Sequence, residues 1–145
     1  MIALRLRLVV ILFASLVLVA CSHDSAATTP DPEAILQSIP AADSAKYEHI
    51  QDMRKWQNPY LIVRTDSVAL LDVADNAEIH LKPDEVLPEL AKLPASNWPY
   101  GRVVAAAELS GRFSETDKIA IRRNKGIIGG LLEGAHIAVR WVPSA

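Results

Sequence analysis

Two kinds of apolar spacing alternate along residues 44–142, and this alternation constrains the fold more than any other feature. Short runs with apolar residues at successive or alternate positions predict β-strands, whereas recurrence at every third or fourth position predicts helices. The predicted strands are residues 60–63, 68–72, 78–81, 102–109 and 137–141. The predicted helices are residues 45–56, 83–93 and 117–133, with a two-turn helix at 34–39 as a further candidate.

The order of these elements predicts the fold class. The first two strands are joined by a short polar turn at residues 65–67, which predicts a hairpin. Later strands are separated by helices, and a strand reached through a helical crossover pairs in parallel with a neighbour. We therefore predict an α+β fold: a small two-layer sandwich with a mixed sheet of about four to five strands and two to three helices, in one domain over residues 34–145.

Two of the predicted helices carry features that affect their length. The helix at residues 45–56 has one apolar side, which consists of Tyr47, Ile50, Met53 and Trp56. Pro88 lacks a backbone donor, so the helix that follows Pro83 should be kinked or begin late. In the last helix, glycines at 126, 129 and 130 each reduce stability by up to about 1 kcal/mol relative to alanine, and we interpret them as a place of close helix packing.

Residues 1–20 have the layout of a secretory signal peptide. A basic start precedes an uncharged apolar run from Leu8 to Ala20, and the chain becomes polar directly after Cys21. The run is shorter than the roughly 20 apolar residues that a membrane-spanning helix needs. Residues 21–33 are rich in Ser, Ala, Thr, Asp and Pro, and this composition predicts a flexible tether.

The end of this run, Leu18-Val19-Ala20-Cys21, resembles the lipobox of bacterial lipoproteins. The resemblance implies cleavage before Cys21, a diacylglyceryl group on its thiol and a further acyl chain such as palmitate on the new amino terminus. Two or three acyl chains give stable anchoring, whereas one does not. The resemblance to the lipobox also implies that the protein faces the periplasm, and Ser22 favours the outer membrane. The alternatives are an ordinary cysteine and an uncleaved run that acts as a weak anchor.

Charge argues against a nucleic-acid partner. Removal of residues 1–20 removes Arg5 and Arg7, which changes the formal net charge from −2 to −4. Nucleic-acid binding depends on clustered basic residues that neutralise phosphates. The densest basic patch consists of Arg122, Arg123 and Lys125, which could face anionic lipid heads or an acidic partner; the alternative is a solvated helix face.

The loop at residues 94–101 contains two large aromatic residues, Trp98 and Tyr100, between prolines and a glycine. Aromatic residues in loops are enriched at binding surfaces, so these two are candidates for an interaction surface. The alternative is that the loop folds back and packs on the core.

From about Tyr60 to Pro143, the order hairpin, helix, strand, helix, strand resembles the periplasmic domain of the ExbD/TolR biopolymer-transport family. The segments that carry the resemblance are YLIVRTDSVALLD, PDEVLPELAKL and GRVVAAAEL. That family has an uncleaved membrane helix with an essential aspartate, whereas the run from Leu8 to Ala20 has no acid. The resemblance therefore implies a periplasmic docking module, with self-association as an option, and no proton-driven transport.

The sequence predicts no catalytic residue, no metal site and no cofactor. The four histidines are dispersed, and no phosphate-binding loop or nucleophile motif is present. We therefore expect a lipid-anchored, non-catalytic interaction or structural module that binds an envelope protein or a second copy of itself. The alternative is an envelope enzyme or small-ligand-binding protein, with a site between the aromatic loop and the turns at Asp66 or Asp75.

Overall fold

The computed structural model describes residues 30–72 and 77–144. The lipobox, Cys21 and Asp75 lie outside these residues. Within the described part, the chain has five strands and four α-helices. All five strands belong to one mixed sheet. The predicted α+β class is therefore confirmed.

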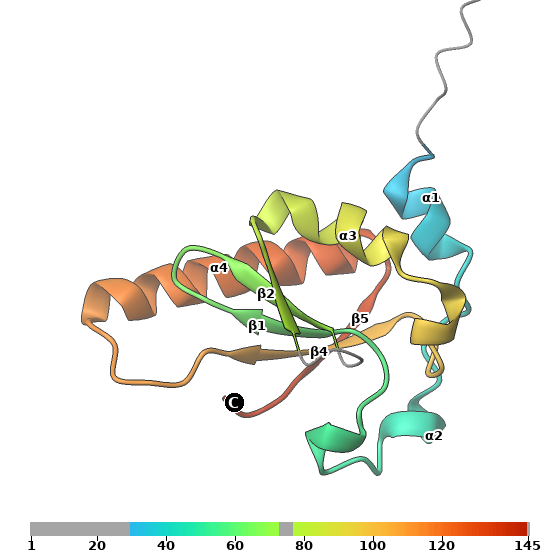
Figure 1. Ribbon diagram of the computed structural model, residues 1–145, viewed down its shortest axis with the longest axis horizontal. Coiled ribbons are helices and arrows are strands. Elements are labelled where there is room, and N and C mark those ends of the chain that lie inside the picture. Colours follow the sequence, from blue (N-terminus) through green and yellow to red (C-terminus); the bar gives the residue numbers. More distant parts are fainter. Residues whose placement is uncertain (1–29, 73–76, 145) are drawn as a thin grey trace, which may run out of the picture.

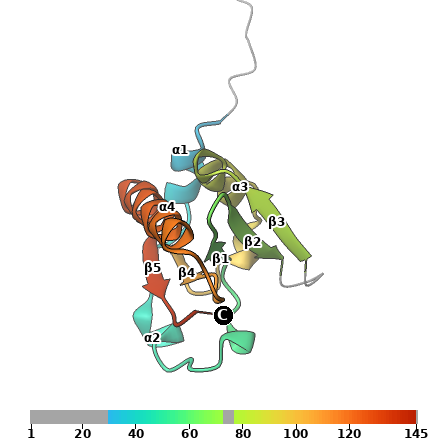
Figure 2. The ribbon, with the colours of Figure 1, turned by 90° about the vertical axis from the view of Figure 1, so that its left-hand side faces the viewer.

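The strands of the sheet lie in the order β3-β2-β1-β4-β5. Their bounds are β1 (Tyr60–Val63), β2 (Val68–Asp72), β3 (Ala77–Leu81), β4 (Val103–Glu108) and β5 (Ala138–Trp141). The first three form an antiparallel meander, while β4 is parallel to both β1 and β5. The strands that follow helical crossovers, β4 and β5, are thus the ones that pair in parallel. Strands β3 and β5 lie at the two edges of the sheet (Figure 2).

The helices cover the sheet unequally. Their bounds are α1 (Pro32–Gln37), α2 (Ser44–Tyr47), α3 (Val86–Lys92) and α4 (Glu115–Gly134). Figures 1 and 2 show α1, α3 and α4 on one face of the sheet and α2 on the other. The late start expected from Pro88 is observed, because a 3-10 turn at Pro83–Glu85 precedes α3. Helix α4 begins two residues earlier than predicted, since Ser114 and Asp117 form a capping box.

The main core lies between the sheet and helices α1, α3 and α4. Alternate residues of each strand point into it, as the pleat of a sheet requires. Val104 and Ala106 of β4 are fully buried there, against Ile128 and Leu132 of α4. The small side chain of Ala106 allows the helix to approach the sheet closely.

The segment over residues 44–56 is not the long helix that its spacing predicts. Only Ser44–Tyr47 is α-helical, and Met53–Lys55 forms a 3-10 turn. The apolar residues of the segment nevertheless cluster as predicted, because Ile50 and Trp56 are buried on the second face of the sheet with Tyr100 of the loop before β4. The guanidinium of Arg140 fixes the segment to β5 by donating hydrogen bonds to the carbonyl oxygens of Tyr47 and Ile50.

A buried amide joins this segment to the loop before β4. The Nδ2 of Asn58 donates to the carbonyl oxygens of Gly101 and Val103 at 2.7 and 2.8 Å, and its Oδ1 accepts from the N–H of Tyr100 at 3.0 Å. Gly101 has φ 79°, and a Cβ there would lie 2.2 Å from the carbonyl oxygen of Ala41. We call these contacts of Asn58 and Gly101 the crossing.

Candidate interaction site at the edge of the sheet

Strand β5 exposes one side of its backbone. The N–H groups of Ala138 and Val142 donate to the carbonyl oxygens of Arg102 and Ala106 on β4. Because the backbone groups of successive strand residues point in opposite directions, those of Val139 and Trp141 point away from the sheet. Among the described residues, no other strand lies beyond β5.

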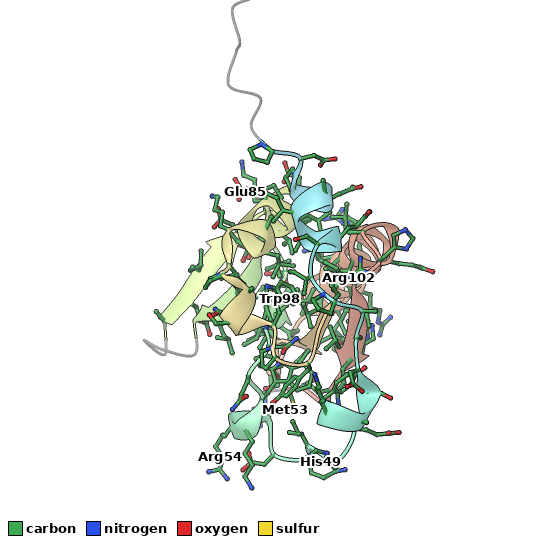
Figure 3. The ribbon with its side chains drawn as sticks, turned by 90° about the vertical axis from the view of Figure 1, so that its right-hand side faces the viewer. His49, Met53, Arg54, Glu85, Trp98 and Arg102 are labelled. Atoms are coloured by element: carbon green, nitrogen blue, oxygen red, sulfur yellow. The ribbon has the colours of Figure 1, made fainter. Side chains whose placement is uncertain are left out.

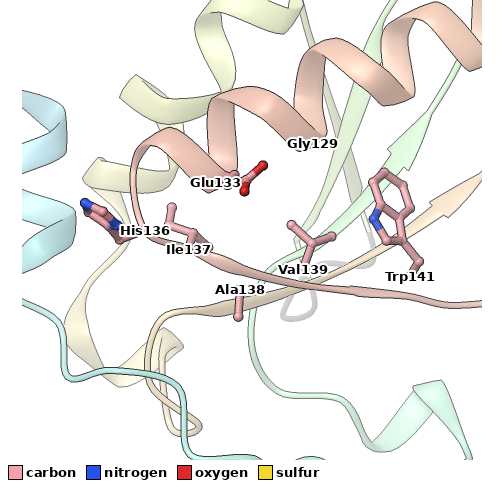
Figure 4. A pocket seen from close by; sticks show the side chains of 7 residues that line it. All are labelled: Gly129, Glu133, His136, Ile137, Ala138, Val139 and Trp141. Carbon is pink, nitrogen blue, oxygen red and sulfur yellow. The ribbon is translucent and has the colours of Figure 1, made fainter.

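A groove with a volume of about 560 Å³ lies between α4 and β5 (Figure 4). Its lining residues are Gly129, Glu133, His136, Ile137, Ala138, Val139 and Trp141. Figure 4 shows Val139 and Trp141 pointing up from β5 toward α4, with Trp141 below Gly129. Trp141 is 38% exposed, so this groove offers an apolar surface to solvent.

A second groove, of about 370 Å³, lies on the other side of the same strand. Its lining residues are Ser44, Tyr47, Glu48, Ala138, Val139 and Arg140. Ala138 and Val139 line both grooves, so the exposed backbone of β5 lies between them. The two grooves and the strand edge form one continuous surface, which we call the β5 edge site.

One basic residue of α4, Lys125, contacts a residue of the first groove. Lys125 donates to Glu108 with Nζ and Oε1 2.7 Å apart, and its Nζ lies 4.6 Å from the ring centroid of Trp141. Arg122 precedes Lys125 by three residues and Gly129 by seven, so it lies on the same side of the helix. Arg123 lies about 100° further around the axis. Of the three predicted basic residues, the structure therefore brings Lys125 into contact with the β5 edge site, through Trp141.

The aromatic loop is not an exposed surface. Trp98 is 4% exposed and Tyr100 is 8% exposed, and Figure 3 shows Trp98 in the interior of the domain. The Nε1 of Trp98 has no acceptor among the described residues. Tyr100 packs in a ring cluster with Tyr47 and Trp56. The expectation of an interaction surface at these two residues is corrected, because the loop folds back and packs on the core.

The site suggested for an enzyme or ligand-binding protein is not assembled in its Asp66 form, and its other form, with Asp75, lies outside the described residues. The aromatic loop precedes β4, whereas Asp66 follows β1. Since β1 and β4 are parallel, the loop and the Asp66 turn lie at opposite ends of the sheet. No group of three or more His, Cys, Asp or Glu that could hold a metal ion occurs in the described part of the chain.

Shifts in pKa also lie away from the β5 edge site. Hydrogen bonds from the side chain and then the backbone of Arg54 lower the pKa of the Asp52 carboxyl, and the same pair raises the pKa of Arg54. Burial raises the pKa of the Tyr60 phenol. An exposed ion pair and a partly buried phenol do not form an acid–base pair, so these groups give no support to a catalytic site.

Little in the sequence indicates the β5 edge site. Alternation of Ile137, Val139 and Trp141 with polar or small residues predicts a strand with one exposed face. It does not predict that the strand lies at an edge, because strand order depends on contacts between distant segments. Trp141 and Gly129 were therefore not singled out as site residues.

No model of a protein family matches the chain, and neither a curated protein nor a solved structure does. In the part of the chain that the structure describes, no helix is both long and apolar enough to cross a membrane. The resemblance to the ExbD/TolR periplasmic domain stays a prediction from element order.

Proposed function

We propose that this chain is a lipid-anchored protein of the bacterial cell envelope whose folded domain faces the periplasm and binds another protein. The β5 edge site is the observation that carries the binding role. It combines an exposed strand backbone, an exposed tryptophan and two adjoining grooves. Exposed strand edges readily pair with other chains, and natural proteins usually protect them.

The lipobox supports the anchoring role. Helix α1 begins at Pro32, so the tether predicted over residues 21–33 ends at residue 31. Residues 22–31 reach at most about 35 Å when fully extended. The domain would therefore remain close to the membrane that holds Cys21, and its partners would be membrane proteins or periplasmic proteins near that surface. Ser22 favours the outer membrane in this proposal.

The enzyme alternative has less support. The grooves beside β5 are open, and their acidic and histidine residues, Glu48, Glu133 and His136, are exposed. Catalytic acids and bases usually lie in sites that shift their pKa through burial or close charges. The described geometry suits contact with a protein better than it suits chemistry on a small molecule.

Intact-mass measurement of the membrane-extracted protein tests the anchor. We expect the mass of residues 21–145 plus acyl groups, and loss of the acyl groups in a Cys21→Ala variant. An unmodified full-length mass in both proteins would refute the anchor. Mild crosslinking in intact cells tests the binding role: we expect a reproducible crosslinked protein partner, and the absence of any partner would count against an interaction module.

A further inference from the structure

We propose that the outer side of α4 lies on the membrane that holds Cys21, with Arg122 and Arg123 against anionic lipid head groups. This inference rests on the lipid anchor proposed above and specifies which face of the domain contacts the lipid. Ile119 precedes the two arginines by three and four residues, so the three side chains are neighbours on the surface of the helix. We call these three residues the α4 patch.

The apolar member of the α4 patch is Ile119. Its side chain is 62% exposed, more than any other large apolar side chain among the described residues. Ile121 and Ile128 of the same helix are buried in the core, so α4 packs on the sheet without Ile119. Surface helices that bind membranes place apolar side chains at the boundary of the head groups and basic side chains on their polar face. An isoleucine between two arginines fits this arrangement.

The charge of the α4 patch is not neutralised within the domain. Residues 118–132 contain four basic residues and no acidic one. Two of the four are paired, Lys118 with Glu115 and Lys125 with Glu108. The two arginines of the patch have no carboxylate partner in the described part of the chain. Their charge is therefore available to an anion outside the domain, whereas a second copy of the patch would repel it.

The chain enters the folded domain on the side where the α4 patch lies. Helix α1 begins at Pro32, and Figures 1 and 2 show α1 and α4 on the same face of the sheet. Residues 22–31 reach at most about 35 Å, and the 20 residues of α4 span about 30 Å. A tether of this reach allows α4 to lie along the membrane. It also keeps lipid at a high effective concentration, which favours lipid over an acidic protein as the occupant.

Acidic residues of the helical layer lie beside α3 and not at the α4 patch. Figure 1 shows the first half of α4, which carries the patch, extending past α3 and past the 3-10 turn before it. That turn contains Asp84 and Glu85, and Glu85 accepts a hydrogen bond from the N–H of Lys82. Repulsion between these acids and lipid phosphates would therefore act away from the patch and turn the first half of α4 toward the lipid.

The test uses the lipidated full chain in vesicles, with a fluorescent label on one engineered cysteine. Cys21 carries the lipid in this proposal, so the engineered cysteine is the free thiol. Gly126→Cys places the label on the outer side of α4, seven residues after Ile119, where a Cβ meets nothing within 4 Å among the described residues. Gln51→Cys places it at an exposed position on the other face of the sheet. Lipids with a nitroxide on the head group quench a label that reaches the membrane surface.

Two charge reversals are compared in vesicles of phosphatidylcholine alone and of phosphatidylcholine mixed with phosphatidylglycerol. Arg123→Glu changes the α4 patch, and Lys55→Glu makes the same change in net charge at an exposed position far from it. Circular dichroism establishes that each variant is folded, and intact mass establishes that it carries acyl chains. A high salt concentration is a second way to weaken the contact without any substitution.

With phosphatidylglycerol present, we expect the nitroxide to quench the label at 126 and not the label at 51. Arg123→Glu should lower the ratio of docked to free domain by about fivefold or more, and Lys55→Glu should leave it within about twofold. High salt should act like Arg123→Glu. Equal quenching at the two positions, no quenching, quenching that needs no anionic lipid, or equal effects of the two reversals would overturn the proposal. An acylated chain without quenching would overturn this inference alone, whereas a chain without acyl groups would overturn the anchor and this inference with it.

Discussion

The crossing and the outer side of α4 both contain glycine, but the surroundings of these glycines differ. At Gly101, a Cβ would lie 2.2 Å from the carbonyl oxygen of Ala41 and 2.8 Å from that of Pro40. At Gly126 and Gly130, a Cβ would meet nothing within 4 Å among the described residues. Packing within the domain therefore dictates the residue at the crossing. It dictates nothing at the outer side of α4, where nothing in the structure explains glycine in place of alanine.

The largest expected effect is that of Gly101→Ala. The backbone at Gly101 has φ 79°, which is unfavourable for alanine, and the added Cβ would overlap the backbone of Ala41. The overlap would also disturb the hydrogen bond from the N–H of Arg102 to the carbonyl oxygen of Pro40. We expect a loss of about 3 kcal/mol or more in the free energy of unfolding, measured by urea denaturation. A loss below about 1 kcal/mol would mean that the crossing relaxes easily, and the contrast with α4 would disappear.

The next effect concerns the polar half of the crossing. Asn58 is 1% exposed, and Asn58→Ala would remove its hydrogen bonds to three backbone groups, of which the carbonyl oxygen of Gly101 keeps the N–H of Val103 as a second partner. We expect a loss of about 3 kcal/mol, because unpaired buried groups cost about 1–3 kcal/mol each and partial relaxation recovers some of this. Urea denaturation of the folded domain measures it.

Asn124→Ala is the matched control for Asn58→Ala. Asn124 is also a buried asparagine, and its Nδ2 donates to the carbonyl oxygens of Arg64 and Thr65. These bonds are only partly buried, so water can replace the lost donor. We expect a loss of about half that of Asn58→Ala. Equal losses at the two positions would show that the crossing has no special role and that any buried asparagine of this fold is equally important.

Local patterns predicted the elements of the sheet, because a strand is visible in a few consecutive residues. Strands β1 and β2 have the predicted bounds. The segment at residues 45–56 shows where such patterns fail. Its apolar residues recur at every third position and are buried as expected, yet most of the segment is not helical. Contact with the sheet and with Arg140 determines its path, and these contacts lie about 90 residues away in the chain.

The candidate site was less predictable than the fold. The basic residues of α4 were visible in the sequence, but Lys125 could be separated from Arg122 and Arg123 only once the helix was placed beside β5. Trp98 and Trp141 have similar neighbours in the sequence, with a proline close to each, yet the first is buried and the second is exposed. The difference arises because Trp98 lies beneath the helical layer, whereas Trp141 ends an edge strand. Edge position is a property of the whole sheet.

The smallest effect, and the only one expected to stabilise, is that of Gly130→Ala. Alanine loses less backbone entropy than glycine on forming a helix, and the described residues leave room for its Cβ. We expect a gain of about 0.5–1 kcal/mol in the free energy of unfolding, measured by the same urea denaturation. Gly129→Ala is the comparison on the β5 side of the same helix: its Cβ would lie 3.9 Å from the Trp141 ring, an ordinary contact, so it should also stabilise the protein. A gain in stability at both positions would show that packing within the domain requires neither glycine. If Gly130→Ala instead destabilised the protein, the outer side of α4 would be packed against another molecule in solution. Both regions would then be packed, and they would differ only in whether the contact lies within the domain or with a partner.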